Sequence, residues 1–130
     1  MSPQLPDLAK KLLEADTFVT LTTLAKDGTP HSTVMWADHD GDDIIFATVV
    51  GRVKERHISR DPRVSVSLFD PANPYAYVTV NGTAALIPEG GPELIQRLSQ
   101  KYTGGRYTLD EGTDNVRVVV RVSPERIYPS

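Results

Sequence analysis

Apolar and polar residues alternate along much of the chain, and this pattern predicts β-strands. The alternation, with many β-branched side chains, predicts strands over residues 17–25, 30–38, 43–50, 63–70, 75–87 and 116–122. Turn residues, with Gly28 and Gly41 among them, separate the first three strands and predict a meander of hairpins. Gly82 interrupts the fifth strand and predicts a bulge or a close approach of two backbones.

Helical spacing of apolar residues predicts amphipathic helices over residues 6–15 and 92–102. A short basic helix is expected after Gly51, where an apolar strand ends. Residues 103–115 hold three glycines and several acids without an apolar pattern, which predicts a loop. Six strands with short turns and a few small helices indicate a mainly β (α+β) chain, with one small barrel over residues 1–130.

Composition narrows the classes of function. The chain has 130 residues, enough for one core, and no cysteine, so a disulfide, a thiolate metal site and a thiol nucleophile are all excluded. A reducing, cytoplasmic compartment fits this composition. No apolar run approaches the ~20 residues of a membrane span, and no leader segment is evident. The net charge of -3 argues against nucleic-acid binding, so neither nucleic acid nor membrane is an expected partner.

Metal and hydrolase chemistry find no support in the sequence. Residues 38–43 resemble the opening of a calcium loop, but a twelve-residue loop beginning at Asp38 would end at Val49 instead of a carboxylate. A hairpin turn explains the segment better. None of the three histidines has a carboxylate or a second histidine at the spacing typical of metal sites. No serine stands in a Gly-x-Ser-x-Gly elbow. We therefore expect no metal ligand.

A cluster of cations follows Gly51. Four basic side chains occur within nine residues: Arg52, Lys54, Arg56 and Arg60. A strand that ends at a glycine and opens into a helix presents free N–H groups and a positive dipole end to an anion such as phosphate. The alternative is an amphipathic helix whose basic side chains face water.

Three aromatic residues are further candidates for ligand contact. Tyr75 and Tyr77 share one face of their strand, where they either pack in the core or form a stacking wall for a planar ligand. Trp36 is the only tryptophan, and it is either a core or interface anchor or a ligand contact.

The segment GRVKERHISRDPRVSVSLFDPANPYAYVTVNGTAAL resembles the pyridoxamine 5'-phosphate oxidase-like split β-barrel superfamily. More closely, it is similar to the actinobacterial branch of flavin/deazaflavin oxidoreductases that bind coenzyme F420. Matching motifs follow in order along nearly the whole chain: LTTLAKDGTPHSTVMW, GRxKxRxxxRDPRVS, a YxxVxGTA-like strand, LSQKYTG and VRVVVRVSPERI. The resemblance implies a six-stranded antiparallel split β-barrel of the FMN-binding type, with short peripheral helices.

The resemblance also implies a cofactor site. Arg52 and Lys54 match positions that contact the cofactor phosphate, with Arg56 as a helper, and Arg60 is expected to be structural beside the following turn. The edge of the ring is expected to run along Thr48, Val49, Val50 and Gly51. Similar proteins are homodimers with the cofactor at the subunit interface, which implies that a second subunit offers Tyr75 and Tyr77. The same likeness places Thr33, Met35 and Trp36 in the pocket.

The implied activity is that of an F420-dependent reductase, which passes hydride between the deazaflavin and a small conjugated acceptor. Hydride chemistry belongs to the cofactor, so the resemblance names no catalytic residue. The chain ends in PERIYPS, where vitamin B6 oxidases carry an Arg-x-His segment for their substrate, so vitamin B6 oxidation is not expected. Three alternatives stay open: an FMN-dependent enzyme of the same fold, a non-catalytic carrier of a deazaflavin, flavin or tetrapyrrole, and a structural dimer.

Overall fold

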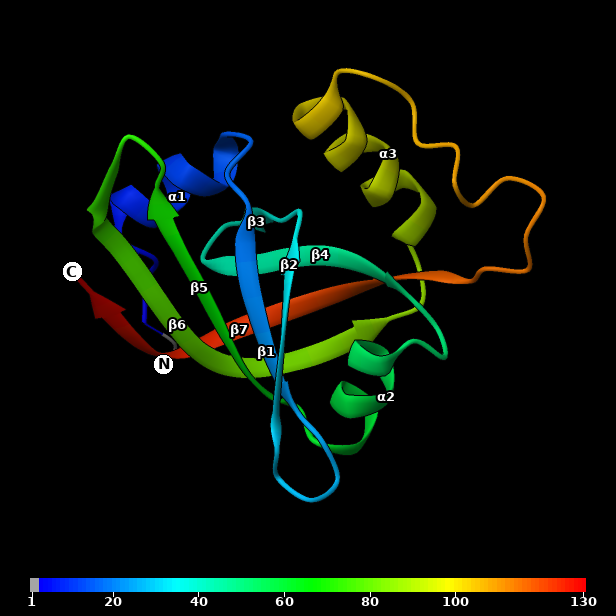
Figure 1. Cartoon of the computed structure of the whole chain (residues 1–130), viewed down its shortest axis with the longest axis horizontal. Coiled ribbons are helices and arrows are strands. Elements are labelled where there is room, and N and C mark those ends of the chain that lie inside the picture. Colours follow the sequence, from blue (N-terminus) through cyan, green and yellow to red (C-terminus); the bar gives the residue numbers. More distant parts are fainter. Residues whose placement is uncertain (1–2) are drawn as a thin grey trace.

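Seven antiparallel strands form one sheet in the computed structural model of the chain, which describes residues 3–130 (Figure 1). The strands are β1 (Val19–Leu24), β2 (Pro30–Met35), β3 (Asp38–Asp40), β4 (Asp43–Val49), β5 (Arg63–Asp70), β6 (Asn73–Ile87) and β7 (Arg117–Pro129). The helices are α1 (Asp7–Glu14), α2 (Val53–Arg60) and α3 (Gly91–Thr103). All three predicted helices are therefore confirmed.

The sheet curls without closing. Its strand order is β2-β1-β5-β6-β7-β4-β3, so β2 and β3 follow each other in sequence but lie at opposite edges. The predicted strand over residues 30–38 is wrong in this respect, because Trp36 and Ala37 break it and Asp38 pairs with Ile45 of β4. The predicted split barrel is confirmed, with seven strands in place of six. His39 and Asp40, predicted in a turn, lie in β3.

The last strand is longer than predicted. The predicted strand ends at Val122, but β7 continues to Pro129 along β6, with Glu125 as the extra residue where the register shifts. The register shifts between Asn81 and Gly82, which confirms the predicted irregularity. A Cβ at Gly82 would lie 2.3 Å from the Ser123 carbonyl oxygen, so the two backbones need a glycine here. β6 also begins early, at Asn73, which shortens the predicted loop after β5.

The main core lies inside the curl. Alternate residues of the strands point inward and pack against α1, and the largest fully buried side chains include Phe46, Leu13, Leu21, Ile44 and Leu68. A second, smaller cluster joins Ile45 to Leu94 and Leu98 of α3. Because α3 covers the other face of β4 and β7, both strands are buried on two sides. This explains why the sequence of β7 opens with an almost continuous apolar run.

A histidine ties α1 to β3. His39 Nε2 lies 2.6 Å from Glu14 Oε2, and Nδ1 lies 2.9 Å from the Gly41 carbonyl oxygen. Both partners are acceptors, so both ring nitrogens donate only when the imidazole is protonated. Burial by itself lowers the pKa of His39, but the bonds to Glu14 and Gly41 outweigh it and raise the pKa above its ordinary value. The ion pair therefore stabilises the fold most at acid pH.

This pair predicts a pH-dependent stability. Below the unfolded-state pKa of about 6.5 the contribution is fully present, and it is lost as pH rises through the higher folded-state pKa. Because Glu14 is largely exposed, we expect the free energy of unfolding to fall by less than about 1 kcal/mol between about pH 6 and about pH 9. Guanidinium unfolding at both pH values measures it. Glu14→Gln should flatten the difference, Glu93→Gln should leave it unchanged, and equal behaviour of the two variants would contradict the assignment.

Candidate functional site

The basic segment forms a turn and a helix at the end of β4. The chain turns through Val50 and Gly51 into α2, and Gly51 has φ +94°, which glycine adopts without strain. Arg52 is the N-cap residue, and its side chain makes no capping bond. The expected row of free N–H groups is partly occupied, because Gly51 N donates to Glu55 Oε2 at 3.0 Å. Side chains, more than backbone, are left to meet an anion.

Three cations lie close together at this point: Arg52, Lys54 and Arg117. Arg117 is paired with Asp110 and lowers the pKa of that carboxyl, and the charge of Arg52 also lowers it. Burial lowers the pKa of the Lys54 ammonium, and the charges of Arg52 and Arg117 lower it further. No hydrogen bond or ion pair within residues 3–130 involves the side chain of Arg52 or Lys54. Like charges that lie close together repel, and an anion bound between them would relieve that repulsion. The cluster is thus suited to a phosphate.

The other two basic residues of α2 differ from these. Arg56 is exposed, and its side chain has no partner within residues 3–130. Arg60 Nη2 donates to the Leu24 carbonyl oxygen at 2.5 Å and so ties α2 to β1, which confirms its predicted structural role. His57 Nδ1 also bonds to β1, at 2.8 Å from Thr23 Oγ1. α2 is therefore held against β1 by its C-terminal half, with its N-terminal half open.

An apolar cavity of about 320 Å³ lies where the two edges of the curled sheet approach each other. We call it the apolar cavity. Val34, Met35 and Trp36 line it at the end of β2, and Ala47 lines it from β4. Its other walls come from the start of β1, from α3 and from the following loop, through Phe18, Ile95, Leu98, Tyr107 and Leu109. No charged side chain lines it within the described chain.

The edge of β4 beside this cavity is free. β3 pairs with β4 only as far as Ile45, so residues 46–49 of β4 have a neighbour, β7, on one side alone. Backbone groups on the open side are available to hydrogen bond with a ring. On the other side the Val50 N–H already donates to the Val116 carbonyl oxygen at 2.9 Å.

The predicted site residues fall into two places. Met35 and Trp36 line the apolar cavity, whereas Thr33 lies further back on β2, half-buried. Thr48 and Val49 are buried, so only their backbone faces the open edge. The side chain of Trp36 is held by Tyr102, with ring centroids 5.3 Å apart in a stacked arrangement. We call the apolar cavity and the adjoining end of β4, which leads into the cation cluster, the cleft. The contacts of these residues with a cofactor stay predictions.

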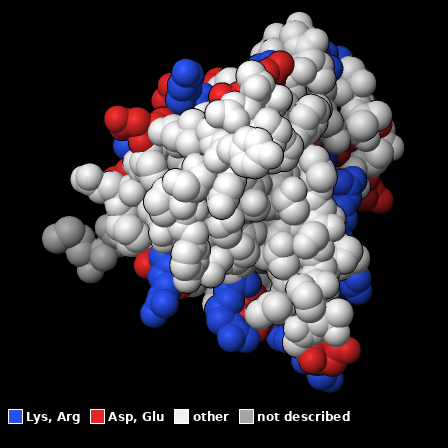
Figure 2. Space-filling view, turned by 60° about the vertical axis from the view of Figure 1, so that its left-hand side comes forward, with Lys and Arg blue, Asp and Glu red and all other residues white. Residues whose placement is uncertain are grey.

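Tyr75 and Tyr77 lie elsewhere, on the outer face of the sheet. Their exposed fractions are 85% and 46%. Core packing, the first reading of this pair, is therefore wrong. A single protomer does not bring them to the cleft. The view in Figure 2, turned by 60° from that of Figure 1, shows mostly uncharged side chains, with charged ones gathered at its margins.

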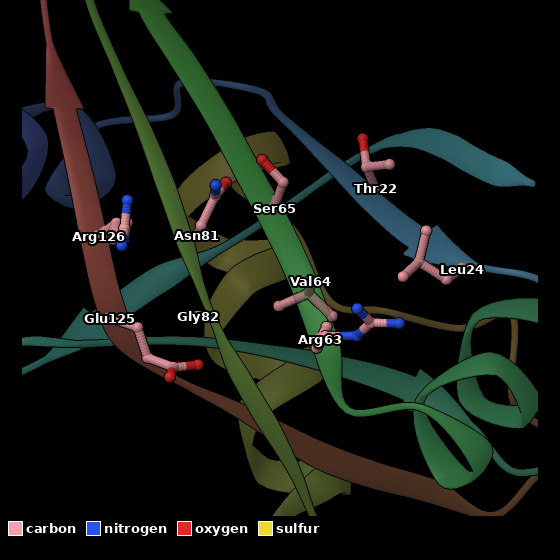
Figure 3. A pocket seen from close by; sticks show the side chains of 9 residues that line it. All are labelled: Thr22, Leu24, Arg63, Val64, Ser65, Asn81, Gly82, Glu125 and Arg126. Carbon is pink, nitrogen blue, oxygen red and sulfur yellow. The ribbon is translucent and has the colours of Figure 1, made fainter. Parts of the chain in front are cut away.

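A second cavity, of about 360 Å³, is hollowed into this outer face (Figure 3). Its walls come from four neighbouring strands, β1, β5, β6 and β7, and include Thr22, Ser65, Asn81, Arg63 and Arg126. Arg63 is already paired with Asp61 through two hydrogen bonds of 3.0 and 2.8 Å. None of the predicted site residues lines this second cavity, so it is separate from the cleft.

Sequence reasoning missed a buried network beside the cleft. Arg117 is only 7% exposed and forms two hydrogen bonds with Asp110, at 3.0 and 2.9 Å. It also donates to Tyr107 Oη at 3.2 Å. Arg117 pairs with Val49 across the sheet, which explains its effect on Lys54. The available signal was an arginine at the start of an apolar strand, directly after an acidic loop.

Within residues 3–130, no group of three or more His, Asp or Glu side chains is placed to hold a metal ion. In the same residues no helix has the length and apolar character needed to cross a membrane.

Comparisons with known proteins agree on one family. The family model described as pyridoxamine 5'-phosphate oxidase matches residues 5–130. No curated protein sequence matches the chain. A solved structure described as an F420 reductase is 31% identical, with 95% of this chain and 98% of that chain covered and a TM-score of 0.84.

Two other solved structures share the architecture. A conserved hypothetical protein from Mycobacterium tuberculosis is 26% identical, with 97% of this chain and 84% of that chain covered and a TM-score of 0.77. General Stress Protein 26 from Bacillus anthracis is 22% identical, with 95% and 94% covered and a TM-score of 0.72, and this likeness shows the fold alone.

Proposed function

The chain belongs to the pyridoxamine 5'-phosphate oxidase family, and on this basis we propose that it is an F420-dependent reductase. The family includes oxidoreductases, and its fold binds flavins. In the proposed reaction, hydride passes between the deazaflavin and a small conjugated acceptor. The likeness to a structure described as an F420 reductase supports this choice of cofactor.

The proposal rests on two cations without side-chain partners in residues 3–130, which lie beside an open strand edge and an uncharged cavity. Arg52 and Lys54 would hold the cofactor phosphate, with Arg56 nearby. The open backbone edge at Thr48 and Val49 would meet the polar edge of the ring, whereas the N–H groups of Val50 and Gly51 already donate within the chain. The apolar cavity adjoins that edge, and burying the apolar surface of an acceptor there would stabilise its complex by about 25 cal/mol per Å². The cations therefore suit the phosphate, the strand edge suits the ring, and the apolar cavity suits an acceptor beside the ring.

We further propose that the protein acts as a homodimer, with the cofactor between the subunits. The outer face of the sheet carries large exposed side chains, among them Phe69, Tyr75 and Tyr77. Such a surface favours burial against a partner. A second copy would bring its Tyr75 and Tyr77 to the cleft of the first. We also propose a cytoplasmic location, because the chain has no cysteine.

The same phosphate site would suit FMN, so FMN is the second candidate cofactor. Parallel titration of the purified protein with F420 and with FMN, followed by fluorescence, separates the two. We expect saturable binding of F420 and weaker binding of FMN. If the purified protein is yellow and shows flavin absorbance, FMN is the favoured cofactor. If neither F420 nor FMN binds, the proposed function is contradicted.

A carrier protein is distinguished by its lack of turnover. We expect bound reduced cofactor to be oxidised when enones or quinones are added, in a single turnover that depends on the acceptor. A tetrapyrrole such as biliverdin belongs in the same panel. If no acceptor changes the rate of oxidation, the protein sequesters its cofactor and is not a reductase.

A further inference from the structure

The loop between α3 and β7 contributes Tyr107 to the wall of the apolar cavity. Of the described residues that line this cavity, only Tyr107 carries a hydroxyl group. The proposed reaction adds hydride to a conjugated carbonyl and leaves negative charge on its oxygen, so a proton donor is needed nearby. No other lining side chain, in the part of the chain that the structure describes, is an acid.

Tyr107 is held firmly although it lies in a loop. Its backbone N–H donates to Gln96 Oε1 at 3.0 Å, and its carbonyl oxygen accepts from Gln96 Nε2 at 2.9 Å. Its ring stands edge-on to Trp36, at an interplanar angle of 83° and a centroid distance of 6.2 Å. These contacts join the loop to α3 and to the end of β2, so the ring is a fixed wall of the cavity.

Arg117 fixes the phenol oxygen. Its guanidinium lies 5.2 Å from the centre of the Tyr107 ring and donates to Oη. Burial by itself lowers the pKa of Arg117, but the bonds and charge of Asp110 outweigh it and raise the pKa, so the guanidinium stays charged. Because Arg117 is only a donor, Oη accepts from it and keeps its own O–H free to donate. No acceptor for this O–H is present among residues 3–130.

We propose that Tyr107 donates the proton to the carbonyl oxygen of the acceptor, with Arg117 as a positioning residue. The proposal rests on the proposed reductase function. Hydride from a bound reduced cofactor would add to the β-carbon of the conjugated carbonyl, and the C=C electron pair would shift toward the carbonyl oxygen. The O–H bond of Tyr107 would break as its proton forms the new O–H bond of the resulting enol. The phenolate that remains lies beside the Arg117 guanidinium until a proton from water restores the phenol.

The lining of the apolar cavity also indicates the chemical class of the acceptor. The cavity lining is uncharged, and the charge of Arg117 is already matched by Asp110 through two hydrogen bonds. A charged acceptor would lose its hydration there without gaining a partner. We infer an uncharged, planar molecule with a conjugated carbonyl, whose apolar ring contacts Trp36 and Leu109 and whose oxygen meets Tyr107 Oη.

Binding to the full-length protein without cofactor tests the contact separately from turnover. Trp36 is the only tryptophan, so quenching of its fluorescence reports occupancy of the cavity. The probes are 1-tetralone, which cannot accept hydride at a conjugated C=C bond, and tetralin, the same skeleton without the carbonyl. Tyr107→Phe is expected to weaken 1-tetralone binding about fivefold and to leave tetralin unchanged. Thr108→Ala, in the same loop, should change neither.

The positioning role has its own readout. Arg117→Lys keeps the charge and loses the fork of donors, so 1-tetralone should bind two- to threefold more weakly, as an order-of-magnitude estimate, with tetralin unchanged. If both probes weaken together, Arg117 only supports the loop and the positioning role is overturned. If Tyr107→Phe keeps the preference of the parent for 1-tetralone, the contact with Tyr107 is overturned.

Turnover completes the test. In single-turnover reduction of 2-cyclohexenone by protein loaded with reduced cofactor, Tyr107→Phe is expected to be about 100-fold slower with unchanged cofactor affinity. An unchanged rate would overturn the proton-donor role. Should this variant not fold, Leu109→Phe replaces an exposed side chain by a larger one and should narrow the cavity without adding a second tryptophan, so that both probes bind more weakly. Unchanged binding overturns the assignment. Failure of F420 and FMN to bind, with the 1-tetralone preference intact, would overturn the reductase function and leave the contact standing.

Discussion

Replacing Arg52 and Lys54 together by alanine is expected to weaken cofactor binding by at least about 100-fold. Each cation would form a charge-assisted hydrogen bond with the phosphate, and such bonds contribute about 1.5–3 kcal/mol each. Lys54 is half-buried, and its ammonium would otherwise lack any partner in residues 3–130. Titration of the double variant with F420, followed by fluorescence, measures the loss.

The control removes the same charge elsewhere. Lys11 and Lys26 are exposed, on α1 and in the hairpin between β1 and β2, and neither has a side-chain partner in the described residues. The double change of both to alanine should leave cofactor affinity within about twofold of the parent, because exposed distant charges are screened. If the Arg52 and Lys54 double variant titrates like the parent, the phosphate site is assigned to the wrong residues.

The second large effect concerns the packing of α3 on β7. A Cβ at Gly91 would lie 2.0 Å from the Arg117 carbonyl oxygen and 2.7 Å from the Val118 nitrogen. β7 cannot retreat easily, because it pairs with β4 on one side and β6 on the other. Gly91→Ala is therefore expected to lower the free energy of unfolding by at least about 3 kcal/mol. Guanidinium unfolding followed by circular dichroism measures it.

Gly105→Ala is the matched control, in the loop that follows the same helix. Its Cβ would meet only Thr103 Oγ1, at 3.8 Å, which is ordinary contact. The free energy of unfolding should change by less than about 1 kcal/mol. Equal stability of the Gly91→Ala and Gly105→Ala variants would show that α3 and β7 separate without cost, contrary to the close contact.

Local patterns were sufficient for most elements. The predicted helices and the strand over residues 63–70 agree with α1, α2, α3 and β5, because amphipathic spacing and turn residues act within a few positions of one another. The irregularity at Gly82 was predicted for the same reason, because a glycine inside a strand pattern is a local signal for a bulge or a close backbone approach. The errors concern strand pairing: residues 30–38 divide between two edges of the sheet, and β7 extends along β6.

The sequence by itself determined the family, the mainly β fold and the position of the cation cluster, because Arg52 and Lys54 follow the end of β4 within a few residues. Only the tertiary structure decided which residues join them. The apolar cavity and the network of Arg117, Asp110 and Tyr107 are built from segments far apart in the chain. Their meeting depends on the curl of the sheet and the packing of α3, which arise from long-range contacts that no local pattern encodes.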